Sequence, residues 1–397
     1  MPSPARETRP AGLPAAERAL QWTLGLAAGA TSLAVFSRLV FFVPKAFGIS
    51  DFTLHVAYAR ALCQGSAAPQ PHFLFELLIC ALAAPVGRPW AFGAAAVAVA
   101  TAAVVAKVIL TYRRVREAGG AAAAFCAALC LLFAMPLFNW WKFPDTYLGQ
   151  VSPNVWHNPT TVAVLPLAFL LFHAAARLTV TDPPRAAAGA GALVLLNCLT
   201  KPNYVLALLP CWLILLADRA RRALLARQVC WLRPALIGAA VAGPAGVVLL
   251  WQASRLGAAG AGVTLAPLAV WRIYSPHIVA SILLSVAFPL AVLGLYFREA
   301  RAARTAWSEA PLLLAWSVLV VAVLQMALLA EAGPRFEHGN FFWASYTANY
   351  LLFVESAVVV AAAPRSGRWI IAWGLLFAHA LVGVVYAFRL AAGWAIL

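Results

Sequence analysis

Two residues capable of acid–base chemistry stand one helical turn apart in the segment that begins at Ser50. Ser50 is a favourable N-cap, so a short helix is expected to begin at Asp51, and the spacing of four places Asp51 and His55 on one face of it. Asp51 could then accept a proton from a substrate hydroxyl while His55 orients that hydroxyl or binds an anion. The plainer interpretation is that Asp51 stabilises the first turn through the helix dipole and that His55 lies at a membrane interface.

Residues 139–160 form the stretch richest in polar and aromatic side chains. Its Trp and Tyr residues could stack on sugar faces, or they could mark a membrane interface. Clustered amides and an imidazole favour hydrogen bonds to substrate hydroxyls, and the N-terminus of the helix expected from Pro159 suits a phosphate. The predicted substrate contacts here are Gln150, Asn154, His157 and Asn158.

Cations at three further places could neutralise a phosphate. Lys201 stands before a proline between two short apolar runs, near the expected end of a helix, and either contacts phosphate or extends to the lipid head groups. Arg272 and His277 precede another expected helix and are similar candidates. Arg335 and His338 could hold a phosphate leaving group, although Arg335 could instead pair with a nearby carboxylate, Glu337. The remaining predicted contacts are Arg60, Asn340 and Trp343.

The elements that must position these residues are apolar. The chain has 397 residues, of which 64% are hydrophobic and 11% charged, and its mean hydropathy of +0.85 excludes a soluble protein of this size. We expect an all-α, polytopic membrane bundle forming one domain over residues 1–397, with about eleven membrane-spanning helices. The apolar runs are 20–42, 90–112, 121–138, 161–178, 186–200, 204–217, 232–251, 277–296, 311–329, 346–363 and 369–388.

The distribution of basic residues predicts the orientation of the bundle. A short run at residues 73–86 contains Glu76, and if this run lies at the outer surface rather than crossing, most arginines collect on the cytoplasmic side. Residues 1–19 are then cytoplasmic, and residues 44–89 form the first outer loop. The candidate site residues fall on the outer face. We expect a multi-pass protein of a bacterial inner membrane, whose net charge of +16 serves topology and contact with anionic lipids rather than nucleic acid.

Several chemistries have no sequence signature here. The seven cysteines form no CxxC pair, so neither a disulfide framework nor a zinc site is indicated. P-loop, GxGxxG, HExxH and GxSxG motifs are missing, which argues against nucleotide, dinucleotide, zinc-protease and serine-hydrolase chemistry in their usual forms. No cofactor is assigned. A divalent metal stays open, but the outer face offers few carboxylates to hold one.

The stretch Asp51-Phe-Thr-Leu-His-Val-Ala-Tyr-Ala-Arg-Ala-Leu-Cys-Gln-Gly, directly after the first apolar run, resembles the beginning of the GT-C superfamily of membrane glycosyltransferases. The resemblance implies that Asp51 is the catalytic aspartate and that the first outer loop contains juxtamembrane helices, which would explain the short run at 73–86. It also makes Asp145 the candidate for a second acidic residue in a later outer loop. The implied donor is a polyprenyl-phosphate-linked sugar.

These observations predict an inverting transfer of a sugar from a polyprenyl-phosphate donor to a lipid or glycan acceptor of the cell envelope. Nucleotide sugars are cytoplasmic, so a site on the outer face needs a donor that crosses the membrane. Asp51 would act as general base, and Lys201, Arg272, Arg335 and His338 would neutralise the departing phosphate. The alternatives are a flippase or transporter, and an O-antigen-type polymerase or ligase. A transporter would favour ionisable residues in mid-helix, and few are expected there: Arg38, Lys107 and Glu355.

Overall fold

The protein is almost entirely helical. A computed structural model describes residues 14–42, 50–66, 70–137, 148–258, 262–303, 311–363 and 367–393. Its eight longest apolar helices are α1 (Ala15–Phe41), α5 (Pro89–Ala118), α7 (Pro159–Arg177), α9 (Asn203–Leu225), α10 (Leu232–Ala258), α14 (Pro311–Leu328), α15 (Phe342–Ala362) and α16 (Gly367–Ala392). These eight are long and apolar enough to cross a membrane, so the described part of the chain is that of a multi-pass membrane protein.

The eleven predicted runs each coincide with helix. Besides the eight long helices, they correspond to α6 (Ala121–Phe133), α8 (Pro184–Thr200) and the pair α12 (Ile278–Ser285) and α13 (Ala287–Ala303). The pair bends by 65° at its junction and would make a ninth span if counted as one. At a rise of about 1.5 Å per residue, α6 and α8 fall short of the ~30 Å hydrocarbon layer. The count of about eleven spans therefore stays a prediction.

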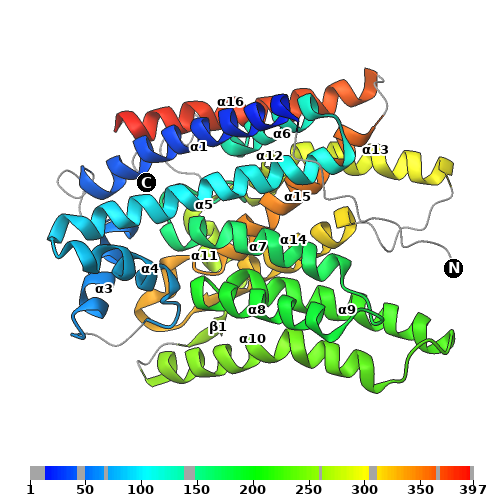
Figure 1. The fold of residues 1–397 in the computed structure, drawn as a ribbon, viewed down its shortest axis with the longest axis horizontal. Coiled ribbons are helices and arrows are strands. Elements are labelled where there is room, and N and C mark those ends of the chain that lie inside the picture. Colours follow the sequence, from blue (N-terminus) through cyan, green and yellow to red (C-terminus); the bar gives the residue numbers. More distant parts are fainter. Residues whose placement is uncertain are drawn as a thin grey trace, which may run out of the picture.

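Figure 1 shows the long helices running roughly parallel, with short elements gathered at the left end. There α3 (Asp51–Cys63) and α4 (Leu74–Ala83), followed by the short helix η1 (Ala84–Val86), pack against the start of α5. We call this the α3–α4 end. The same end holds α11 (Ala269–Tyr274), η2 (Gly333–His338) and a two-stranded antiparallel sheet of β1 (Val263–Leu265) and β2 (Leu329–Glu331).

The opposite end, which we call the arginine end, contains the last turns of α5, α7 and α9. The predicted apolar run 204–217 ends before Arg219 and Arg222, but α9 continues through these arginines to Leu225. Arginine, alanine and leucine are strong helix formers, which favours this extension. Arg219 donates to the carbonyl oxygens of Ala176 and Leu178, at 2.7 and 2.6 Å, and so caps the C-terminus of α7.

The most enclosed helix is α15, in which every residue from Phe342 to Ala357 is buried. It packs against α5, α9, α13 and α14 and so lies at the centre of the bundle. The peripheral helices instead expose large apolar side chains, among them Trp22 of α1, Leu250 of α10 and Ile370 of α16. An apolar outer surface around a packed core is what a lipid environment requires.

The predicted helix at Asp51 is confirmed. The Ser50 hydroxyl accepts a hydrogen bond from the Thr53 amide at 3.3 Å and donates to the Leu39 carbonyl at 3.1 Å, so the N-cap also joins α3 to the end of α1. Phe52 is fully buried against Phe36 of α1, with ring centroids 5.1 Å apart. These contacts fix the start of α3 and with it the position of Asp51.

Candidate functional site

A cavity of about 240 Å³ opens at the α3–α4 end. Segments far apart in the sequence converge on it: the start of α3, the segment 148–158, the end of α11, the end of η2 and the start of α15. We call it the site cavity. Its lining residues are Ser50, Asp51, Leu148, His157, Tyr274, His338, Gly339, Phe342 and Trp343.

A chain of three polar side chains runs from the cavity into the protein. The Asn158 amide Nδ2 donates to Asp51 Oδ2 at 2.9 Å, and Asn158 Oδ1 accepts from the Lys201 ammonium at 2.9 Å. Asn158 thus holds a carboxylate with one end of its amide and a cation with the other. The predicted residues Asp51, Asn158 and Lys201 are brought together, and their chemical roles stay predictions.

Asn158 can do this because it is also the N-cap of α7. Its Oδ1 accepts from the Thr161 amide at 3.0 Å, which fixes the side chain at the helix start. Pro159 follows at the first helical position, where its missing N–H has no consequence. The residues that begin α7, Asn158 and Pro159, therefore also fix the side chain that links Asp51 to Lys201.

Lys201 is 7% exposed and lies between α8 and α9. Its ammonium also donates to Thr160 Oγ1 at 3.0 Å and stands 4.8 Å from the centre of the Trp343 ring. Burial lowers the pKa of Lys201 to about 7, against the opposing effect of Asp51 and Glu76. At neutral pH the side chain can be either charged or neutral, which suits a residue that meets an anionic ligand.

His157 lines the cavity together with Asp51 and Trp343. Its ring centroid is 5.5 Å from that of Trp343, and Trp343 meets Tyr346 edge to face at 5.5 Å. Burial lowers the pKa of His157 to about 4, opposed by Asp51 and assisted by Lys201. The imidazole is therefore neutral at physiological pH.

Asp51 and His55 have different partners in the structure, and their predicted joint action on a hydroxyl stays a prediction. His55 Nδ1 contacts Glu76 Oε1 of α4, and both side chains are buried, while Asp51 binds Asn158 instead. His72 lies beside this pair, with its ring centroid 6.5 Å from that of His55. Desolvation and the nearby Lys201 lower the pKa of His72 to about 3. In the sequence, Glu76 stands out only as the acidic residue of the short apolar run 73–86.

The segment after β2 forms a second polar group at the rim. Arg335 Nε lies 3.1 Å from Glu331 Oε2, so Arg335 pairs with Glu331 and not with Glu337. Asn340 donates to the same carboxylate oxygen at 2.6 Å and accepts from the Trp343 indole at 3.2 Å. The rim therefore supports Trp343.

The segment 148–158 is irregular yet buried, so its backbone polar groups need partners inside the bundle. The Val151 amide donates to Ser285 of α12 at 2.9 Å, the Asn349 side chain of α15 donates to the Val151 carbonyl at 2.6 Å, and the Trp271 indole donates to the Gly149 carbonyl at 2.8 Å. A Cβ on Gly149 would stand 2.4 Å from the Tyr274 carbonyl oxygen, which explains the glycine. Contacts from three helices thus hold this segment.

Several predicted contacts lie away from the cavity lining. Inside the bundle, Asn154 forms hydrogen bonds with Lys107 and with the carbonyl groups of residues 131 and 134. Gln150 is buried and does not line the cavity. Arg60 is exposed and donates to the Pro89 carbonyl at 3.1 Å. Arg272 and His277 are exposed on the surface. Asp145 lies outside the described residues.

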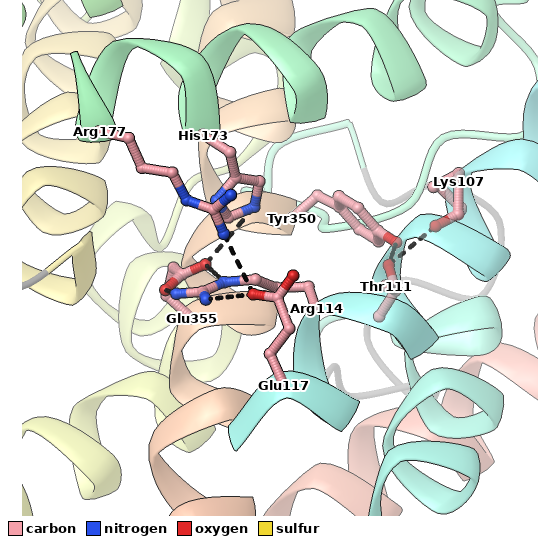
Figure 2. Close-up of polar contacts among 8 residues, drawn as sticks. All are labelled: Lys107, Thr111, Arg114, Glu117, His173, Arg177, Tyr350 and Glu355. Carbon is pink, nitrogen blue, oxygen red and sulfur yellow. Dashed lines mark hydrogen bonds and ion pairs between the residues drawn. The ribbon is translucent and has the colours of Figure 1, made fainter. Parts of the chain in front are cut away.

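Sequence reasoning missed a second polar cluster, shown in Figure 2, where side chains from α5, α7 and α15 meet. Arg114 of α5 donates to both oxygens of Glu355 of α15, at 3.1 and 2.8 Å, and His173 Nε2 of α7 lies 3.6 Å from Glu355 Oε1. Lys107, earlier on α5, contacts Asn154 and the Tyr350 ring. Their scattered positions in apolar runs gave no sign that they form one polar seam.

Within the described ranges, no group of three or more His, Cys, Asp or Glu side chains is placed to hold a metal ion. No known family model matches the chain, and no curated protein matches its sequence. The functional conclusion therefore rests on the geometry and on the residues themselves.

Proposed function

We propose that the protein is a membrane glycosyltransferase that moves a sugar from a polyprenyl-phosphate donor to a hydroxyl of a cell-envelope acceptor. The observation that carries the proposal is the chain Asp51–Asn158–Lys201 beside an aromatic cavity at one end of an apolar helical bundle. A carboxylate, a cation and stacking surfaces are what transfer from a sugar phosphate to an alcohol needs. The resemblance of the Asp51 segment to the GT-C superfamily agrees with this function.

In the proposed reaction, Asp51 accepts the proton of the acceptor hydroxyl. The acceptor oxygen forms a bond to the anomeric carbon as the bond from that carbon to the phosphate oxygen breaks, and the electron pair leaves with the lipid phosphate. Configuration inverts at the anomeric carbon. Asn158 holds Asp51 Oδ2 at 2.9 Å, which leaves the other carboxylate oxygen to the cavity.

The leaving phosphate needs positive charge that is already in place. Lys201 is buried 4.8 Å from the ring of Trp343, a residue that lines the cavity together with His338. An anionic donor near Lys201 favours its charged form, because an opposite charge raises the pKa of a lysine. Arg335, although paired with Glu331, adds a second cation at the rim. Trp343, Tyr274 and Phe342 supply the surfaces on which a sugar ring or an isoprenoid chain can pack.

We further propose that the α3–α4 end faces the outside of a bacterial inner membrane and that the arginine end, with residues 1–19, faces the cytoplasm. The arginines at the ends of α5, α7 and α9 support this orientation through the positive-inside bias. About eleven spans fit it, if α6, α8 and the bent pair α12–α13 each cross.

Transfer from a lipid-linked donor tests the proposal. Membranes containing the wild-type protein should move radiolabelled sugar from a polyprenyl-phosphate monosaccharide to an envelope acceptor. Asp51→Asn should lower the rate by about 10²- to 10⁴-fold, the usual contribution of a general base. Asp218→Asn is the matched control, because Asp218 only pairs with Arg221 and Arg222 at the arginine end. Full transfer by Asp51→Asn would refute the base assignment.

A transporter or flippase is the second candidate, and one observation favours it. The polar seam places the ionisable residues Lys107, Arg114, His173 and Glu355 between packed helices, where transporters often keep them. A transporter would move a lipid-linked sugar across sealed vesicles without forming a glycosidic bond. Net transfer to an acceptor in opened membranes separates the two functions.

The O-antigen-type polymerase or ligase alternative shares the site chemistry but uses a different donor. Parallel assays with a polyprenyl-phosphate monosaccharide and a polyprenyl-pyrophosphate oligosaccharide discriminate between them. We expect turnover of the monophosphate. Turnover of the pyrophosphate oligosaccharide alone would assign the protein to the polymerase or ligase class.

A further inference from the structure

Lys107 is an unusual residue for its position. It stands well inside α5 and is 3% exposed, and within the described ranges no carboxylate lies at ion-pair distance from it. Its ammonium donates to Asn154 Oδ1 at 2.5 Å and lies 4.9 Å from the centre of the Tyr350 ring. A charge at this depth is unfavourable and is seldom kept without a use, so the Asn154 contact needs an explanation.

Asn154 connects Lys107 to the end of another helix. Its Nδ2 donates to the carbonyl oxygens of Leu131 and Ala134, at 3.0 and 2.7 Å, at the C-terminus of α6. The last carbonyl groups of a helix lack intrahelical partners and carry the negative end of its dipole. Asn154 therefore links the Lys107 ammonium to the negative end of α6, and this link holds the middle of the segment 148–158.

The same segment ends in site residues. Three and four positions after Asn154 come His157, which lines the cavity, and Asn158, which binds both Asp51 and Lys201. With so little chain between them, a shift at Asn154 displaces His157 and Asn158 as well. We propose that Lys107 is a positioning residue: its ammonium fixes Asn154 and thereby places His157 and Asn158 against Asp51 and Lys201.

A double-mutant cycle separates positioning from stability. Lys107→Met leaves Asn154 Oδ1 buried without its donor, which destabilises the protein as well as freeing the segment. Asn154→Leu removes the partner of Lys107 and also leaves the Leu131 and Ala134 carbonyls without the Asn154 amide. If Lys107 acts on the segment through Asn154, the double variant Lys107→Met, Asn154→Leu changes the segment no more than Asn154→Leu alone, whereas a lysine with a separate structural role adds its own effect.

Amide hydrogen exchange of the detergent-solubilised protein measures the position of the segment directly. In Lys107→Met we expect exchange at residues 150–158 to rise by about tenfold or more while peptides of α14 keep the wild-type rate, and the double variant should exchange at 150–158 as fast as Asn154→Leu alone. Arg177→Met is the charge-loss control, because Arg177 is exposed at the arginine end and pairs with Glu117. It should leave exchange at 150–158 unchanged.

The functional part rests on the proposed transfer reaction, so turnover is measured on the same samples. We expect Lys107→Met to lose at least about tenfold in kcat, and the double variant to turn over as fast as Asn154→Leu alone. Wild-type exchange at 150–158 in Lys107→Met, or wild-type kcat in that variant despite raised exchange, would overturn the positioning role. If the wild-type protein shows no transfer at all, the proposed function fails, and the exchange result alone still decides whether Lys107 holds the segment.

Discussion

At Asn158 a single side chain serves the fold and the site together. Its carbonyl oxygen caps α7 through the Thr161 amide and accepts from Lys201, while its amide nitrogen donates to Asp51. A carboxylate and an ammonium are thereby fixed at the two ends of one planar group. This arrangement orders both charged groups before a substrate arrives, which is what preorganised catalysis requires.

Two substitutions at this residue separate its roles. Asn158→Ala removes the cap and should lower the free energy of unfolding by about 1 kcal/mol, together with activity. Asn158→Asp keeps an oxygen for the cap but loses the donor to Asp51 and places a second carboxylate beside it. We expect Asn158→Asp to retain more stability than Asn158→Ala in thermal denaturation while transfer is lost in both. Wild-type turnover by Asn158→Asp would show that Asp51 needs no partner.

The charge on Lys201 predicts the pH dependence of transfer. Because burial lowers the pKa of Lys201 to about 7, the charged fraction in the free protein falls as pH rises through that value. If this charge binds the donor phosphate, kcat/KM falls on the alkaline side with a midpoint near pH 7. His157, with a pKa of about 4, stays neutral over this range and does not contribute.

Lys201→Arg keeps its charge throughout, because guanidinium does not titrate in proteins. The arginine variant should therefore show a weaker or shifted alkaline decline, even if its maximum rate is lower. The measurement is kcat/KM against pH for the two proteins. An identical decline in both would assign the titration to another group.

Part of the site follows from residue types and part does not. Asp51, His157, Asn158 and Lys201 are singled out by polar chemistry in apolar surroundings, and the structure brings them together. The pairing of His55 depends on how α4 folds back against α3, which spacing along α3 cannot reveal. Asn154 is a residue type that often contacts polar ligands. Its partner Lys107 lies far away in the sequence, and the bond between them makes Asn154 an internal support instead.

At the scale of elements, apolar runs locate the helices because their backbone must be satisfied internally in lipid. The apolar runs do not predict where each helix begins and ends. The predicted segment 204–217 becomes α9 of Asn203–Leu225, since helix-forming residues continue past the apolar part. The three-residue strands β1 and β2 are too short to leave a pattern, and they form by pairing Val263 with Glu331 across the bundle end.

Close helix packing gives a prediction at this scale. A Cβ on Gly383 of α16 would lie 1.5 Å from the Phe133 carbonyl oxygen at the end of α6, whereas a Cβ on Gly374 of the same helix would meet nothing within 4 Å. Gly383→Ala should destabilise the protein by about 1–3 kcal/mol through overpacking. Gly374→Ala should melt at or slightly above the wild-type temperature, because alanine favours helix.

The comparison is made by thermal unfolding in one detergent. Equal melting temperatures for the two alanine variants would mean that α16 does not pack against α6 as described. Such a result would also question the Leu131 and Ala134 carbonyls as anchors for Asn154, because these lie at the same end of α6.

At the scale of the whole molecule, the two ends of the bundle differ in chemistry. The α3–α4 end holds the cavity with Asp51, His157 and Trp343, and the arginine end holds the basic last turns of α5, α7 and α9. The buried residues Lys107, Arg114 and Glu355 lie along α5 and α15, with Lys107 further from the arginine end than Arg114. The uneven distribution of arginine in the sequence distinguishes the two ends of the bundle. The convergence of distant loops on one cavity can be seen only in the folded chain.

The account depends most on the site cavity facing away from the cytoplasm, where only a lipid-linked donor can reach it. Sealed, right-side-out membranes provide the measurement, with His338→Cys as a probe at the cavity and native Cys230, exposed near the arginine end, as the opposite control. A membrane-impermeant maleimide should label position 338 in sealed vesicles and Cys230 only after the vesicles are opened. Labelling of Cys230 from outside, with position 338 protected until opening, would contradict the proposed orientation and the lipid-linked donor with it.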